Sequence, residues 1–170
     1  MTRATAVPVN PDLDLVLDRV VEVPPALVYR AWTEPEHLMP WFCPKPWRTT
    51  ECEIDLRPGG KFRTVMEGPA GERNDHEGCW LEIVPERRLV WTGLMTAGFR
   101  PSSIPNEVPV FTCILTLTPE GKGTRYRAHV MHRDPAGKRA HEAMGFSQGW
   151  GAALDQLVAL AGAGGYSTSG

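Results

Sequence analysis

The chain has 170 residues, of which 42% are hydrophobic and 22% charged, and its formal net charge is −2 at pH 7. This length suits one globular domain and is short for two. So small a net charge gives no electrostatic attraction toward nucleic acid or an anionic membrane, and we expect neither as a partner. We predict one domain over 12–162, with flexible ends at 1–11 and 163–170.

The N-terminal stretch, MTRATAVPVNPDLD, contains one arginine and no extended apolar run. A secretory signal needs an apolar core of about seven or more residues, and a membrane span needs a much longer one. We therefore expect a cytoplasmic protein.

The first elements are a strand and two short helices. Residues 13–23 alternate between apolar and acidic side chains, which predicts a half-buried strand. Pro24 and Pro25 end this strand, and PALVYRAWTEP then carries apolar residues at helical spacing. A second short helix is predicted in PEHLMPWF, which starts with a proline and has acidic residues near its first turn.

Six further strands follow, which makes seven with the first. The alternation returns from Thr49, and RPGG makes a turn at Gly59 and Gly60 before the next strand. A loop rich in proline and serine, 97–109, interrupts the series. The remaining strand segments are KFRTVMEG, HEGCWLEIV, RRLVWTGLM, VFTCILTLTP and TRYRAHVMH.

The final segment, from Asp134 to about Ala161, is predicted to be one long helix with a single apolar stripe. Gly145, Gly149 and Gly151 weaken it, and their clustering indicates close approach of another surface. The expected fold is α+β: a curved antiparallel sheet of about six to seven strands, covered on one face by this helix. Such an arrangement leaves a space between sheet and helix.

No metal or cofactor is expected. His129 and His132 lie three apart in a predicted strand and so point to opposite faces, with His129 on the face that we expect to be exposed. The Gly59–Gly60 turn lacks the features of a phosphate loop. The cysteines have no CxxC pair, so buried free thiols are expected rather than a zinc site or disulfides: Cys43, Cys52, Cys79 and Cys113.

Five stretches, in order, resemble the START-related helix-grip superfamily known as SRPBCC, and within it the family of proteins similar to the activator of the heat-shock-protein-ninety ATPase. They are VPPALVYRAWTEPEHLMPWF, CEIDLRPGGKFR, GCWLEIVPERRLVWT, FTCILTLTPEGKGTRYRAHV and MGFSQGWGAALDQLVAL. The resemblance implies a helix-grip fold with a cavity for apolar small molecules, and it implies no particular reaction. Departures from the family pattern at Cys43, Pro44, Pro46 and Gly93 touch the expected pocket, so a relative's ligand is not transferred.

Aromatic side chains are the main candidates for lining this cavity. Each could instead be ordinary core packing, but rings bury a large area and an indole can also donate one hydrogen bond. The predicted lining is Trp41, Phe42, Trp47, Met66, Trp80, Trp91, Phe111, His132, Phe146 and Trp150.

Two polar residues are weak catalytic candidates. Glu82 shares a strand face with His76, Gly78 and Trp80, and would be partly desolvated if that face meets the cavity. The other reading is an exposed glutamate. His132 lies on the more apolar face of its strand and is either a hydrogen-bonded structural histidine or a polar anchor or general base at the pocket mouth.

Three functions compete. The first is non-enzymatic binding of a hydrophobic or amphipathic small molecule, and the second is an enzyme (hydrolase, cyclase or isomerase) acting in the same cavity. The third is a chaperone ATPase-activating interaction, although the co-chaperone of the family's name has a further N-terminal domain for which this chain lacks room. The resemblance also implies that the protein could form a homodimer, with the loop over 97–109 as a subunit contact or as a lid.

Overall fold

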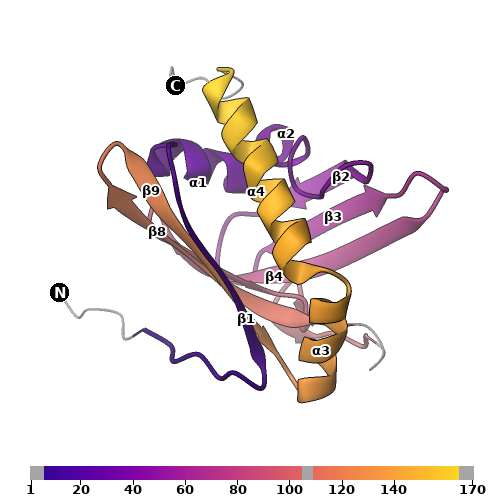
Figure 1. The fold of residues 1–170 in the computed structure, drawn as a ribbon. Helices are drawn as coiled ribbons and strands as arrows, with labels where there is room; N and C mark the ends of the chain where they lie inside the picture. The colour runs from indigo at the N-terminus through magenta and orange to yellow at the C-terminus, as the bar shows by residue number, and fades with distance from the viewer. Residues whose placement is uncertain (1–5, 105–108, 165–170) are drawn as a thin grey trace.

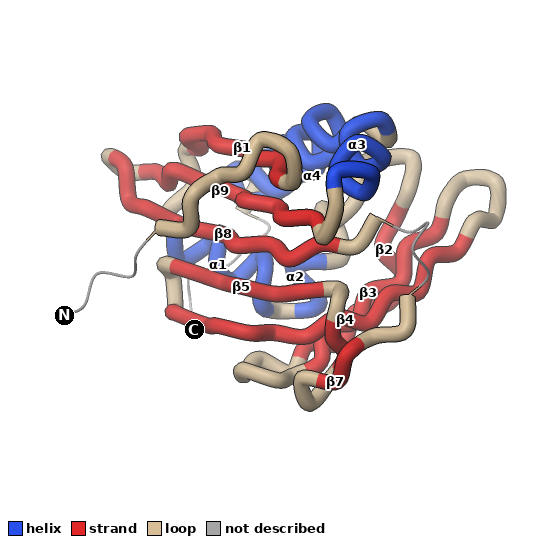
Figure 2. Tube along the Cα trace, turned by 90° about the horizontal axis from the view of Figure 1, so that it is seen from below, coloured by secondary structure: helices blue, strands red, loops and turns tan. Residues whose placement is uncertain are grey.

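The computed structural model describes residues 6–104 and 109–164 (Figure 1). The ends expected to be flexible, and residues 105–108 of the loop over 97–109, therefore lie partly or wholly outside the described residues. The fold is α+β, as the sequence predicts, with one large antiparallel sheet and helices gathered on one of its faces. Figure 2 looks onto this sheet, whose central strands lie side by side.

The large sheet has seven strands in the order β1-β9-β8-β5-β4-β3-β2, and every neighbouring pair is antiparallel. Its strands match the seven segments predicted from alternation. They are β1 (Asp14–Val21), β2 (Arg48–Ile54), β3 (Lys61–Glu67), β4 (Arg73–Val84), β5 (Arg88–Thr92), β8 (Phe111–Glu120) and β9 (Gly123–His132).

A second, two-stranded sheet was not expected. It pairs β6 (Met95–Thr96) with β7 (Arg100–Pro101) beyond the end of β5. Gly98 lies between these strands with a positive φ of 78°, which a non-glycine residue adopts only at a cost. The first part of the predicted loop is therefore a small hairpin.

The first two helices, α1 (Pro25–Thr33) and α2 (Pro35–Leu38), follow β1 as predicted. Pro25 and Pro35 occupy the first turns, where a missing backbone N–H costs nothing. Figure 1 shows α1 and α2 near the C-terminal end of the last helix, which crosses the sheet diagonally.

The prediction of one unbroken C-terminal helix was wrong. The segment forms two helices, α3 (Pro135–Ala143) and α4 (Phe146–Gly162), and only α4 crosses the sheet. Gly145 separates them with φ 90°, the left-handed region that ends a right-handed helix. Asp134 caps α3 by accepting a hydrogen bond from the Gly137 backbone N–H at 2.7 Å.

The expectation that His129 is exposed was also wrong, because its side chain is 1% exposed. It does lie on the face of β9 opposite His132, but its Nε2 bonds to Asp14 Oδ2 at 2.7 Å. The chain that precedes β1 crosses this outer face of the sheet (Figure 2) and contributes the Asn10 N–H to the same carboxylate. A strand face that faces away from the core is thus locally covered.

The core fills the space between the inner face of the sheet and helices α1 and α4. Its centre is aromatic: Trp32 contacts Trp41 edge-on at 5.2 Å between ring centroids, and Trp80 stacks on Phe62 at 4.5 Å. Within the described ranges, no helix has the length and apolar character needed to cross a bilayer.

Candidate functional site

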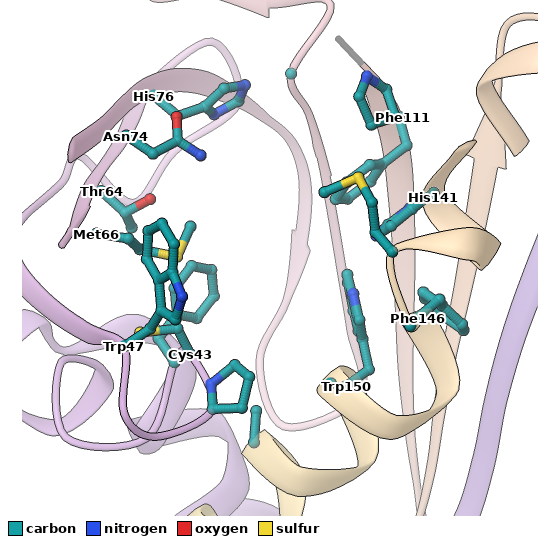
Figure 3. Close-up of a pocket in the computed structure, with 18 of the residues that line it drawn as sticks. Cys43, Trp47, Thr64, Met66, Asn74, His76, Phe111, His141, Phe146 and Trp150 are labelled. Atoms are coloured by element: carbon teal, nitrogen blue, oxygen red, sulfur yellow. The ribbon is translucent and has the colours of Figure 1, made fainter. Parts of the chain in front are cut away.

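A cavity of about 430 Å³ lies between the inner face of the sheet and the α3–α4 segment. Figure 3 shows two facing walls. Trp47, Thr64, Met66, Asn74 and His76 lie on one side, and Phe111, His141, Phe146 and Trp150 lie on the other. Cavities of this size lined mainly by apolar side chains are typical of small-molecule sites.

Eight of the ten residues predicted to line a cavity are found in this lining. They come from the loop after α2, from three strands and from α4, so that segments far apart in sequence meet around one space. The eight are Trp41, Phe42, Trp47, Met66, Trp91, Phe111, Phe146 and Trp150.

The other two, Trp80 and His132, lie outside the lining. Trp80 is fully buried and its ring stacks on Phe62, which lines the cavity in its place. His132 is 5% exposed and lies behind His141, to which it is hydrogen-bonded. Both residues therefore support the wall from behind.

Glu82 is also outside the cavity, and the reason is a β-bulge. Pairing between β4 and β5 shifts between Trp80 and Glu82, so that Leu81 is an extra residue. The alternation reverses at such a bulge. Glu82 therefore pairs with Val90 on the outer face, is 44% exposed, and forms an ion pair with Arg88 at 3.2 Å.

His132 and His141, at the α3 end of the cavity, form a hydrogen-bonded pair. Only His132 was predicted from the sequence to belong to the site. His132 Nδ1 bonds to the backbone oxygen of Leu13 at 2.9 Å, and His132 Nε2 bonds to His141 Nδ1 at 2.9 Å. His141 lines the cavity and stacks on Phe111, with ring centroids 5.0 Å apart and an interplanar angle of 19°. Phe146 and Trp150 contact its ring edge-on.

Burial keeps both imidazoles uncharged near neutral pH. Desolvation lowers the pKa of His141 to about 4, and the neighbouring His132 adds to this effect. Desolvation also lowers the pKa of His132. The pair therefore offers the cavity a neutral imidazole rather than a positive charge.

The facing wall carries polar groups that were not predicted: Thr64, Asn74 and His76. Thr64 could have been found, since it alternates with Phe62 and Met66 on one face of β3. Burial lowers the pKa of His76 as well. A Cβ at Gly93 would lie 2.8 Å from His76 Cε1, so the His76 ring fits only because Gly93 has no side chain.

Trp91, in the lining between the two walls, has a buried indole N–H without a hydrogen-bond partner among the described residues. Trp32 and Trp41 are different, because their indoles donate to Tyr126 Oη and to the Ala31 backbone oxygen, both at 3.2 Å. A buried donor without an acceptor costs free energy, which an acceptor on a bound molecule would recover. Trp80 has an equally unpartnered N–H behind the wall.

Hydrogen bonds fix the loop after α2 against α4. Gln156 Nε2 donates to the backbone oxygens of Trp41 at 3.2 Å and Cys43 at 2.9 Å, and its Oε1 accepts from the Lys45 N–H at 3.0 Å. One side chain thus joins the two segments that hold rings on either side of the cavity. We expect this end of the site to be largely preformed.

The model of the family described as Activator of Hsp90 ATPase homolog 1-like protein matches residues 22–162. The chain belongs to this family. The resemblance identified in the sequence is thereby confirmed, and the helix-grip architecture agrees with it.

Solved structures of related proteins share the fold. Protein NE0264 from Nitrosomonas europaea is 45% identical, with a TM-score of 0.86 over 93% of this chain and 100% of that one. Protein CV1439 from Chromobacterium violaceum is 27% identical, with a TM-score of 0.68 over 86% of this chain and 95% of that one. Protein Ms6760 from Mycobacterium smegmatis is 25% identical, with a TM-score of 0.70 over 88% of this chain and 90% of that one. No protein with a curated description matches the chain.

Proposed function

We propose that the protein binds a hydrophobic or amphipathic small molecule in the cavity between the sheet and helix α4. The observation that carries this proposal is the cavity itself, which has a volume of about 430 Å³ and ring-lined walls. In a packed protein interior, voids larger than a water molecule are few. A space of this size, held open by side chains from several elements, favours a ligand.

The chemistry of the walls favours a ligand that is mainly apolar with a small number of polar atoms. Aromatic faces supply most of the contact area. Against them stand an unpartnered indole N–H at Trp91 and imidazoles at His76 and His141, which favour polar atoms at defined places. Burial of a full charge beside neutral imidazoles would be costly, so the ligand should be uncharged where it meets them.

A cavity-filling variant tests the proposal. Gly149 lines the cavity on α4, and the nearest atom of the described residues to a Cβ there would be Pro44 Cγ at 3.9 Å. Gly149→Leu should therefore fold, with a helix propensity more favourable by about 1 kcal/mol, while its side chain occupies ligand space. We expect affinity for the apolar fluorescent probe N-phenyl-1-naphthylamine to fall by roughly tenfold or more.

The matched control is Gly162→Leu, which makes the same change at the exposed C-terminal end of α4, where no atom of the described residues lies within 4 Å of a Cβ. Its probe affinity should equal that of the wild type. If Gly149→Leu binds the probe as tightly as Gly162→Leu does, the probe is not in the cavity and the proposal is wrong.

The other functions predicted from the sequence have less support. Glu82 and His132, which the enzyme hypothesis assigned as acid–base groups, do not line the cavity. A chaperone ATPase-activating role and a homodimer stay predictions, for which stimulation of a chaperone ATPase and the mass of the particle in solution are the respective tests.

A further inference from the structure

The His132–His141 pair has a defined hydrogen-bond direction. The Leu13 backbone oxygen can only accept, so His132 Nδ1 must carry the hydrogen in that 2.9 Å bond. A neutral His132 then has only a lone pair at Nε2. The 2.9 Å bond between His132 Nε2 and His141 Nδ1 therefore requires that His141 Nδ1 carries the hydrogen.

It follows that the remaining nitrogen of His141, Nε2, has a lone pair and no hydrogen. Within the described parts of the chain, this atom has no hydrogen-bond partner, although the ring lies in the cavity lining. The ring is held in place on three sides, by stacking on Phe111 and by edge contacts with Phe146 and Trp150. The site thus presents a fixed acceptor beside aromatic faces.

We propose that His141 is a ligand-binding residue that accepts a hydrogen bond at Nε2, and that the ligand is an uncharged aromatic compound bearing a hydroxyl group. His132 acts as a positioning residue that sets the tautomer of His141. This inference rests on the proposed function and narrows it, because a purely apolar ligand would leave the acceptor unsatisfied and bind less tightly.

The ligand class is tested by calorimetric titration of the whole protein at pH 7.5 with 2-naphthol and with 2-methoxynaphthalene. The two compounds share the same rings, but only 2-naphthol can donate a hydrogen bond. We expect wild type to prefer 2-naphthol by about tenfold, the value of one well-made hydrogen bond. His141→Phe keeps an aromatic ring beside Phe111 but removes the acceptor nitrogen, so the ratio of its affinities for the two compounds should fall from about ten to about one.

The tautomer has its own readout. In long-range proton–nitrogen spectra, His141 should show a protonated Nδ1 and an unprotonated Nε2 in the free protein, and Nε2 should shift when 2-naphthol binds. A spectrum with the hydrogen on Nε2 of His141 would overturn the inference. So would equal affinity of wild type for the two compounds.

The failure of this inference can be separated from the failure of the proposed function. Equal binding of the two compounds overturns the role of His141 and leaves the cavity as a binding site. Binding of neither compound also overturns the stated ligand class. In that case the comparison of Gly149→Leu with Gly162→Leu still decides whether apolar molecules enter the cavity.

Discussion

Gly145 is the residue on which the break between α3 and α4 depends, and replacing it with alanine should destabilise the protein by about 1–2 kcal/mol. The cost comes from the backbone, because φ at Gly145 is 90° and a residue with a Cβ pays about that amount in the left-handed region. Steric overlap adds little, since the nearest atom to a Cβ, Gln148 Oε1, is 3.6 Å away. The contribution of the junction is therefore cleanly isolated.

The assay is urea denaturation followed by tryptophan fluorescence, with Gly162→Ala as the control. Gly162 is the last residue of α4, and a Cβ there meets no atom within 4 Å in the described part of the chain. Its replacement should therefore be neutral or stabilising by less than about 1 kcal/mol. For a chain of this size, the loss at Gly145 corresponds to a melting temperature lower by roughly 2–8 °C. If the two variants are equally stable, the left-handed backbone at Gly145 does not penalise a Cβ and this account of the junction is wrong.

Two further predictions concern buried polar groups. Because burial lowers the pKa of His141 to about 4, below the ordinary value of about 6.5, the unfolded chain takes up a proton first as the pH falls. The free energy of unfolding should therefore decrease as the pH falls from about 6.5 to about 4, and by about 1 kcal/mol at pH 5 after allowance for solvent screening. His141→Phe should remove this part of the pH dependence, as measured by urea denaturation at several pH values. Tyr126→Phe should cost about 1–3 kcal/mol, because it leaves the buried indole N–H of Trp32 without its 3.2 Å acceptor. Tyr29→Phe, at a partly exposed tyrosine, is the control, and equal losses of stability in the two tyrosine variants would contradict this assignment.

The strands could be predicted from the sequence because alternation is a local property. Each of the seven strands has its own period-two pattern and a turn signal at its end. The bulge at Leu81 could not be predicted in this way. The segment HEGCWLEIV has the same alternating pattern whether or not it contains a bulge. The bulge nevertheless places Glu82 on the outer face of the sheet and not on the inner face with Trp80.

The cavity lining was predictable for the rings and not for the polar groups. Tryptophan and phenylalanine side chains are usually buried, so the aromatic residues of a sequence are also the candidates for lining a cavity. Nothing in the sequence indicates that His141 lines a cavity, because α3 has no fully buried residue and its sequence is typical of a solvent-exposed helix. The role of His141 depends on its hydrogen bond to His132, which joins α3 to β9. The burial of His129 likewise depends on a hydrogen bond to Asp14, a residue far away in sequence.

The most direct test of the proposed binding site is a titration of the protein with N-phenyl-1-naphthylamine, followed through the indole N–H signals of the tryptophans. Trp47 and Trp150 lie on facing walls of the cavity, and the Trp91 indole in its lining has a buried N–H with no partner among the described residues. Trp80 stacks on Phe62 and is not part of the lining. Binding in the cavity predicts that the signals of Trp47, Trp91 and Trp150 shift together and saturate while that of Trp80 moves least. Saturable binding of the probe with these three signals unmoved would place it elsewhere and contradict the proposed function.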